Sequence, residues 1–228
     1  MIEDILPAPV AAADSRTDLS DGHLYPEEQA PLARAADSRR REFATVRCCA
    51  RIALAKLGLP PAPIPRGPDG APIWPAGVVG SMTHCPAYRA AAVARASAVR
   101  SVGVDAEPNE PLPPDVLDVV ARDSERAWVS CLQATRPDVS WDTLLFSAKE
   151  SVFKTWYPLH RRWLDFDQII ITVEPSDGTF AARLAGPATP AGAAAPASFA
   201  GRWLTRDSLL MTAIAVLRAP RGAADAMS

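Results

Sequence analysis

The sequence lacks the features that would place the protein in a membrane, on a secretory route or on nucleic acid. No run of about 18 apolar residues occurs, so no segment is long enough to span a bilayer. The first fifteen residues, MIEDILPAPVAAADS, are acidic and have no continuous apolar core, which argues against a secretory signal peptide. The formal net charge is only −2, and this value does not favour a general nucleic-acid-binding protein.

Cysteine is scarce as well. The chain has four, Cys48, Cys49, Cys85 and Cys131, and no CxxC pair occurs among them. Adjacent Cys48 and Cys49 are poor disulfide partners for each other. We therefore expect free, buried cysteines and a protein of the reducing cytoplasm.

The chain does contain enough apolar material for a folded core. It has 228 residues, of which 48% are hydrophobic, which is sufficient for one large domain or two small ones. Residues 1–37 are interrupted by prolines and are predicted to be irregular. Apolar residues at helical spacing then predict a helix that Ser38 caps and Gly58 ends.

The predicted elements that follow repeat one order. Short strands at 77–82 and 87–94 flank a polar THCP turn, and a third strand begins at 101. A helical region to about residue 131 and a helix at 146–156 then precede hairpins at 169–184 and 201–217. This order predicts an α+β fold of two pseudo-symmetric halves, 1–103 and 104–228, with the active site between them. Each half would pack a helix on a small antiparallel sheet.

Two carboxylates lie at the end of the third predicted strand, in the stretch VGVDAEP. Side chains alternate along a strand, so Asp105 and Glu107 point to the same side and Ala106 to the other. Two carboxylates on one side repel each other unless a cation lies between them or solvent separates them. A metal site and ordinary surface charge both fit this pattern taken alone.

The stretch FSAKESVFKTW adds a third carboxylate and a cation. On a helix Glu150 and Lys154 are one turn apart on the same face, which fits an exposed salt bridge worth about 0.3–0.5 kcal/mol. The surrounding side chains are too apolar for an exposed helix: Phe146, Val152, Phe153, Trp156 and Tyr157. Buried charges need partners, so both should face a polar site. With Asp105 and Glu107, Glu150 completes an oxygen-ligand set suited to Mg²⁺.

These blocks carry a family resemblance. VGVDAEP, followed about forty residues later by FSAKESVFKTWYP, resembles the signature pair of the 4′-phosphopantetheinyl transferase superfamily, and most closely its surfactin/enterobactin-type single-chain enzymes. The upstream blocks RRREFATVRCCAR and VVGSMTHC resemble the same family, so the likeness covers about residues 38–218. Some relatives carry a polar residue where this chain has Ala106, and alanine cannot supply a metal ligand.

The resemblance implies an enzyme that moves the 4′-phosphopantetheine arm of coenzyme A onto a serine of an apo carrier protein and releases adenosine 3′,5′-bisphosphate. The nucleophile belongs to the partner, so no serine-histidine-aspartate triad is required. By resemblance Asp105, Glu107 and Glu150 hold Mg²⁺, or Mn²⁺ in its place. Lys154 donates to a phosphate oxygen, and Glu150, or a metal-bound water that it positions, is the general base.

The same resemblance implies a set of coenzyme A contacts. His84 is the candidate for the 3′-phosphate, although a lone histidine is more often an ordinary core residue. Lys149 is expected to contact phosphate or a partner, although it points about 100° away from Glu150 on the helix. The remaining candidates are Arg39, Arg47, Arg66, Ser81 and Thr83. The alternative for the arginine run is a solvated basic face, to which Arg40 and Arg41 are most readily assigned.

The expected partners are coenzyme A and apo acyl or peptidyl carrier proteins of polyketide synthases, peptide synthetases or fatty-acid synthase, as in secondary metabolite biosynthesis. Arg161, Arg162 and Trp163 could meet an acidic carrier, residues 186–200 are expected to be a surface insertion, and a monomer is expected. Two alternatives stay open: a hydrolase that cleaves the pyrophosphate of coenzyme A, and a non-catalytic module that binds coenzyme A or a carrier protein.

Overall fold

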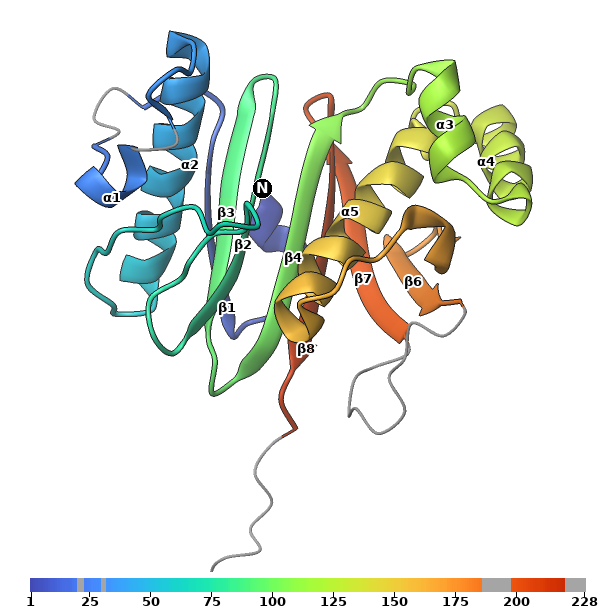
Figure 1. Cartoon of the computed structure of the whole chain (residues 1–228). Helices are drawn as coiled ribbons and strands as arrows, with labels where there is room; N and C mark the ends of the chain where they lie inside the picture. The colour runs from blue at the N-terminus through green and yellow to red at the C-terminus, as the bar shows by residue number, and fades with distance from the viewer. Residues whose placement is uncertain (20–22, 30–31, 186–197, 220–228) are drawn as a thin grey trace, which may run out of the picture.

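Two antiparallel sheets and the helices that cover them form the protein (Figure 1). The structure is a computed structural model and describes residues 1–19, 23–29, 32–185 and 198–219. The elements run in chain order as η1 (Ile2–Ile5), β1 (Val10–Ser15), α1 (Pro26–Gln29), α2 (Asp37–Lys56), β2 (Val78–Cys85), β3 (Tyr88–Arg95), β4 (Val99–Pro108), α3 (Pro114–Val120), α4 (Asp123–Thr135), α5 (Trp141–His160), η3 (Phe166–Gln168), β5 (Ile169–Glu174), β6 (Thr179–Leu184), β7 (Ser198–Arg206) and β8 (Leu209–Leu217).

The smaller sheet has the strand order β1-β3-β2, and the larger sheet has the order β4-β8-β7-β6-β5. Every pairing between neighbouring strands is antiparallel. The predicted α+β class with two antiparallel sheets is therefore confirmed, as are both C-terminal hairpins. The surface insertion expected at 186–200 lies largely outside the described residues, at 186–197.

The expectation that residues 1–37 are irregular is wrong. Within them β1 forms the outer strand of the smaller sheet and pairs with β3, with Val10 opposite Ala94 and Ser15 opposite Arg89. Three consecutive alanines in β1 have a weak preference for strands. Its partner strand lies far along the chain, so no local pattern marks the pairing.

Two boundaries also differ from expectation. Helix α2 begins at Asp37, with Ala36 as its N-cap residue and no side-chain cap, so Ser38 lies inside the first turn. Strand β2 continues through Thr83 and His84 to Cys85, and the turn falls at the next two residues, where Ala87 adopts a positive φ of 59°. The THCP stretch is therefore mostly strand.

Each long helix covers one face of one sheet. On α2, Cys49, Ala50 and Leu54 pack against the smaller sheet, where Ala91 and Val93 are fully buried. On α5 the fully buried side chains Trp141, Leu144, Leu145, Ala148 and Val152 face the larger sheet together with residues of α3 and α4. None of the described helices combines the length and apolarity needed to cross a membrane.

A third apolar core joins the two sheets on the side away from the long helices. Tyr88 of β3, Val104 of β4, Met211 of β8 and Ile2 of η1 are all fully buried in it. The boundary predicted between residues 103 and 104 falls inside β4, which pairs with β8 over nearly its whole length. The division into halves at that residue stays a prediction.

Candidate active site

The candidate site is built where α5 crosses β4. A Cβ atom on Gly103 would collide with the carbonyl oxygen of Ser151 and the hydroxyl of Thr155, so only glycine lets the helix lie this close to the strand. The Ser101 hydroxyl donates to the Thr155 carbonyl at 2.8 Å on the same side of β4. This close approach sets α5 against the strand end that carries Asp105.

Asp105 and Lys154 form the centre of the site. The Lys154 ammonium lies 2.6 Å from Oδ1 of Asp105 and 3.3 Å from the Val104 carbonyl. Asp105 is 2% exposed, and its second carboxylate oxygen, Oδ2, is buried without a hydrogen-bond partner. A buried carboxylate oxygen with no donor is rare, and it leaves Oδ2 able to accept from a ligand.

Glu107 and Glu150 add two half-buried carboxyls around the same lysine. Burial, and after it the charge of Asp105, raise the pKa of Glu107 to about 7, although Lys154 opposes the rise. Burial also raises the pKa of Glu150. For Lys154 burial alone would lower the pKa, but Asp105 and Glu150 outweigh it, and the pKa of the ammonium is raised. Three carboxyls therefore share one cation.

This donor set fits a divalent cation with oxygen ligands. The carboxyls of Asp105, Glu107 and Glu150 are hard oxygen donors. Burial and mutual repulsion raise the free energy of their ionised forms, and a cation bound between them would lower it. Over the part of the chain that the structure describes, no three acidic, histidine or cysteine side chains are already arranged as a metal site. In this conformation the Lys154 ammonium is the group that neutralises Asp105.

Ala106 has no part in this set. It is fully buried in the core that joins the sheets, on the face of β4 opposite α5. Strand alternation therefore directs any side chain at this position away from Asp105 and Glu107.

Ser81 and Thr83, both predicted as coenzyme A contacts, instead link the two sheets. The Ser81 hydroxyl accepts a hydrogen bond from the Val104 backbone at 3.1 Å, and the Thr83 hydroxyl accepts one from Ala106 at 3.1 Å. The Thr83 hydroxyl also donates to Oδ1 of Asp105 at 3.2 Å. Both side chains are nearly fully buried, so we assign them to the joint between β2 and β4 and to the support of Asp105.

His84 faces the other side of the site in a cluster with Arg39 and Glu42. Nδ1 of His84 lies 3.1 Å from a Glu42 carboxylate oxygen, and Nε2 lies 2.8 Å from the Arg39 guanidinium. Burial lowers the pKa of His84, Glu42 opposes this change, and Arg39 and Lys154 add to it. Lys154 is close enough to influence the pKa of His84, so this cluster lies near the carboxyl site.

Glu42 was not among the residues predicted from the sequence. It pairs with Arg39 one turn earlier on α2, and this spacing is the only signal that the sequence offers. Its contact with His84 depends on the packing of α2 against β2.

Arg47 is buried and supports a loop, although it was predicted to contact coenzyme A. Its Nε donates to the Ile64 carbonyl at 2.9 Å, and its guanidinium lies 3.1 Å above the ring of Phe43. Burial lowers the pKa of Arg47 to about 10. Glu28 is fully buried, and one of its carboxylate oxygens lies 3.9 Å from Nε of Arg47. The same carboxylate accepts from Arg51 at 3.0 Å and from the Ile64 backbone at 2.7 Å.

Lys149 lies inside the C-terminal core and not at the site. Its ammonium is fully buried and donates to Glu125 at 2.7 Å, to the Val120 carbonyl at 2.8 Å and to the Phe166 carbonyl at 3.0 Å. All three donors are used, so no proton of the ammonium is left for a phosphate. We assign Lys149 a structural role in place of the predicted phosphate contact.

Arg66 is exposed in the loop between α2 and β2. An isolated β-bridge pairs Arg66 with Pro72.

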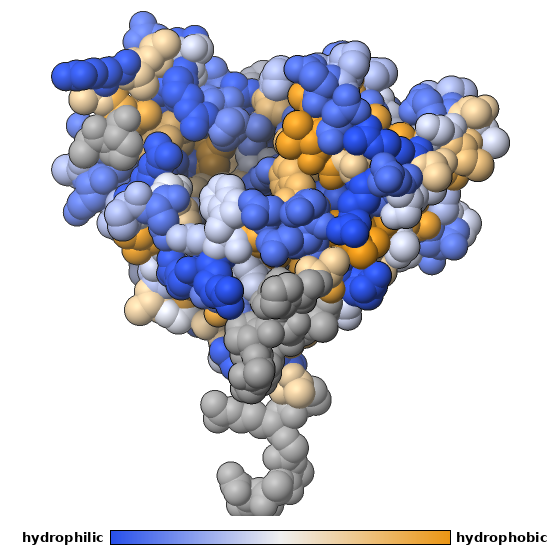
Figure 2. Space-filling view, turned by 45° about the vertical axis from the view of Figure 1, so that its right-hand side comes forward, coloured by the Kyte–Doolittle hydropathy of each residue, from blue (hydrophilic) through white to orange (hydrophobic). Residues whose placement is uncertain are grey.

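The surface is hollowed between the lobe that carries α2 and the lobe that carries α5 (Figure 2). We call this hollow the cleft. Arg39 on α2 and His84 on β2 belong to the first lobe, and Glu150 and Lys154 on α5 belong to the second.

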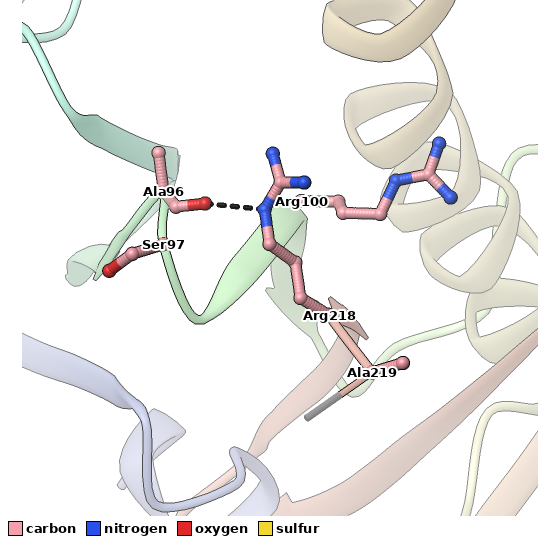
Figure 3. A pocket seen from close by; sticks show the side chains of 5 residues that line it. All are labelled: Ala96, Ser97, Arg100, Arg218 and Ala219. Atoms are coloured by element: carbon pink, nitrogen blue, oxygen red, sulfur yellow. Dashed lines mark hydrogen bonds between the residues drawn. The ribbon is translucent and has the colours of Figure 1, made fainter. Parts of the chain in front are cut away.

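A separate cavity of about 630 Å³ lies at the opposite end of β4 (Figure 3). The residues that line it are Ala96, Ser97, Arg100, Arg218 and Ala219. The Arg218 guanidinium closes one side by donating to the Ala96 carbonyl at 2.6 Å. The cavity is distinct from the carboxyl site, because Arg100 and Asp105 are five residues apart on an extended strand.

Comparison with known proteins identifies the class. A model of the 4′-phosphopantetheinyl transferase N-terminal domain matches residues 27–94, and a model of the 4′-phosphopantetheinyl transferase superfamily matches residues 101–203. The chain belongs to the 4′-phosphopantetheinyl transferase superfamily.

The matched relatives cover nearly the whole chain. It is 54% identical over 228 residues to 4′-phosphopantetheinyl transferase Svp of Streptomyces mobaraensis, a match that spans 99% of this chain and 92% of that protein. It is 48% identical to 4′-phosphopantetheinyl transferase Npt of Nocardia iowensis and 44% identical to 4′-phosphopantetheinyl transferase PptT of Mycobacterium tuberculosis, over 94% of this chain in each case and 99% and 97% of those proteins.

Membership of this family, at this identity, makes the chain a transferase. It transfers the phosphopantetheine of coenzyme A to carrier proteins. The resemblance and the activity inferred from the paired motifs are therefore confirmed.

Proposed function

We propose that Asp105, Glu107, Glu150 and Lys154 carry the transfer chemistry, with Mg²⁺ held by the three carboxylates. The observation that carries this proposal is the meeting of three carboxyls and one ammonium where α5 crosses β4. Structural ion pairs rarely gather three acids around one base, because the uncompensated charge raises the free energy of the folded state.

The fit of the cation rests on this excess charge. Oδ2 of Asp105 is buried and lacks a partner, and the pKa values of Glu107 and Glu150 are raised by burial. When bound, Mg²⁺, or Mn²⁺ in its place, neutralises charge on the pyrophosphate of coenzyme A and favours ionised carboxyls.

Glu150 and Lys154 have separate roles in the transfer. The serine hydroxyl of the carrier attacks the phosphorus that bears the pantetheine arm, so a new oxygen–phosphorus bond forms and the pyrophosphate linkage breaks. The serine proton passes to Glu150, directly or through a water, and its raised pKa suits a general base. Lys154 donates to the phosphate oxygens and stabilises the charge on the departing adenosine 3′,5′-bisphosphate.

The opposite wall of the cleft binds the 3′-phosphate of coenzyme A. Arg39 is 47% exposed at its side chain and touches His84, so both can donate to one phosphate. Arg66 supplies a further guanidinium from its loop. Glu42 holds the His84 ring through Nδ1 and leaves Nε2 facing Arg39.

The acceptors that we propose are the acyl and peptidyl carrier domains of polyketide synthases, peptide synthetases or fatty-acid synthase. Carrier domains are generally acidic near the modified serine, and the surface after α5 is basic and apolar. Trp163 is 72% exposed there, and Arg161 and Arg162 precede it. We further propose a cytoplasmic location, since the described cysteines are all free.

One experiment tests the assignment. The protein is incubated with coenzyme A, Mg²⁺ and several apo carrier proteins, and the carriers are weighed by mass spectrometry. The wild type should add one phosphopantetheine per carrier, and chelation of the metal should stop the reaction. Glu150→Gln should lower the rate by at least about 100-fold, the size of a lost general base, while circular dichroism stays unchanged. Glu174→Gln on β5 makes the same substitution far from the site and should behave as the wild type.

The outcomes separate the alternatives. Full turnover by Glu150→Gln would refute its role as the base. Release of phosphopantetheine without any carrier would indicate a pyrophosphate hydrolase. Binding of coenzyme A with no mass gain on any carrier would indicate a non-catalytic module.

A further inference from the structure

The loop that carries Arg66 reaches across the cleft and is tied to the end of α5. The Tyr157 hydroxyl donates to Oδ2 of Asp69 at 2.8 Å, and the Arg161 guanidinium donates to the same oxygen at 3.2 Å. Asp69 lies between α2 and β2, whereas Tyr157 and Arg161 lie at the C-terminal end of α5. We call this three-residue contact the clasp.

The loop is built so that Asp69 and Arg66 move as one unit. Two backbone hydrogen bonds close the loop. The Gly67 N–H donates to the Ala71 carbonyl at 2.8 Å, and the Gly70 N–H donates to the Gly67 carbonyl at 3.0 Å. The Ala71 backbone also donates to Oδ1 of Asp69 at 3.2 Å, which turns Oδ2 outward toward α5.

Gly70 lies directly against the guanidinium of Arg66. Gly70 has a positive φ of 88°, and a Cβ atom added there would lie 3.1 Å from a terminal nitrogen of Arg66. The guanidinium therefore packs on the backbone next to Asp69. A shift of the loop tip moves the guanidinium with it.

The α5 side of the clasp is equally fixed. Tyr157 follows Lys154 by three residues, so the two side chains lie on neighbouring positions of one helix face. The Tyr157 ring packs on Phe153 with centroids 5.7 Å apart, which restricts its rotation. Arg161 adopts a left-handed conformation with φ 51° at the helix end, and its backbone donates to the Tyr157 carbonyl at 2.8 Å.

We propose that Tyr157 and Asp69 are positioning residues that set Arg66 opposite Lys154 across the coenzyme A cleft. This inference rests on the proposed role of Arg66 in binding coenzyme A. The clasp joins the helix with the proposed phosphate-binding lysine to the loop with the proposed phosphate-binding arginine. Neither clasp residue needs to touch coenzyme A itself.

The competing explanation is a surface hydrogen bond that only stabilises the fold. Asp69 and Arg161 are exposed, so the ion pair between them contributes little to stability. The two explanations differ in what they change: a stabilising bond changes the unfolding temperature alone, whereas a positioning bond changes the affinity for coenzyme A and depends on Arg66.

The test measures the Kd of coenzyme A by calorimetry without carrier, together with kcat and both KM values. Tyr157→Phe should raise the Kd and KM for coenzyme A about threefold to tenfold, the effect of one net hydrogen bond, and change kcat and the carrier KM less than about twofold. Asp69→Asn retains an acceptor oxygen and should raise the Kd less than Asp69→Ala does. Thr179→Val, which removes a hydroxyl–aspartate bond at the β5–β6 turn, should leave the Kd unchanged.

A second comparison links the clasp to Arg66. Arg66→Ala should raise the Kd for coenzyme A, and adding Tyr157→Phe to that variant should raise it no further. An unchanged Kd in Tyr157→Phe would overturn the proposal. So would independent, multiplying effects of the two substitutions, or a normal Kd in Arg66→Ala. Because the Kd needs no carrier, the clasp is tested even where transfer fails, and failed transfer counts against the proposed function alone.

Discussion

The imidazole of His84 lies between the Glu42 carboxylate and the Arg39 guanidinium. These neighbours influence the protonation state of the ring, and so how it can bind a phosphate. Burial lowers its pKa, and Arg39 adds to this change, whereas Glu42 opposes it. The neutral ring is therefore favoured in the free protein. A bound phosphate dianion reverses this preference, because opposite charge nearby favours the protonated ring.

The pH dependence of coenzyme A affinity follows from this arrangement. The pKa of His84 should be higher in the complex than in the free protein, so binding takes up a proton between those two values. Affinity should then fall as the pH rises through the interval between the pKa of His84 in the free protein and its pKa in the complex. Calorimetry in buffers of different ionisation enthalpy measures the proton uptake. His84→Ala should reduce it, and persistence of the same uptake in that variant would contradict the assignment.

Helix α5 is bound to the elements around it by a buried ion pair. Glu125 at the start of α4 accepts from the Lys149 ammonium, from the Arg122 backbone at 2.9 Å and from the Ile171 backbone of β5 at 2.8 Å. One carboxylate thus joins α4, α5 and β5. The angle of Lys149 on the helix shows that it points away from the face that carries Glu150 and Lys154, but only the packing of α4 shows which residues it contacts.

Removal of one partner of this pair should therefore destabilise the fold. Lys149→Met leaves Glu125 as a fully buried carboxylate without its cation, which should lower the free energy of unfolding by about 3–5 kcal/mol. Urea denaturation measures the loss, and adding Glu125→Gln to Lys149→Met should restore part of it.

The matched control is Lys56→Met. Lys56 forms an ion pair with Glu3 in which both side chains are about half exposed, and it also donates to the Ala12 carbonyl at 2.6 Å, so its loss should cost less than that of Lys149, about 1–2 kcal/mol. Unchanged stability in Lys149→Met together with a raised KM for coenzyme A would reinstate the phosphate contact.

The whole molecule repeats one arrangement in its two lobes. Glu28 in the first lobe and Glu125 in the second are both fully buried, and each accepts from the backbone three residues earlier, at Tyr25 and Arg122. Each also binds a cation of the long helix, which is Arg51 on α2 and Lys149 on α5. The sheets differ in size, but the matching buried acids support the pseudo-symmetry that the order of elements predicted.

A single copy of the chain supplies both walls of the cleft, so we predict a monomer. Arg39 and His84 come from one lobe, Asp105 and Lys154 from the other, and the third core holds the lobes together. Light scattering coupled to gel filtration should give a mass of about 24.3 kDa. A mass two or three times larger, with full activity confined to that species, would contradict the prediction.

Local periodicity was enough to predict which acidic side chains share a side of their element with one another or with Lys154. Alternation along β4 places Asp105 and Glu107 on one side and Ala106 on the other, and the helical repeat places Glu150 beside Lys154. Both rules act within one element, so the sequence alone determines them. The order of helices and strands likewise determined the α+β class with two antiparallel sheets.

Only the tertiary structure decided which polar side chains face the cleft. Ser81, Thr83, Arg47 and Lys149 all have suitable chemistry for a phosphate, but each is buried and is hydrogen-bonded to a backbone or carboxylate group distant in the chain. Long-range packing determines the partners of these four side chains. It also determines the pairing of strand β1, the contact of Glu42 with His84, and the clasp. Periodicity predicts the direction in which a side chain points from its own helix or strand. It carries no information about which other element that side chain will contact.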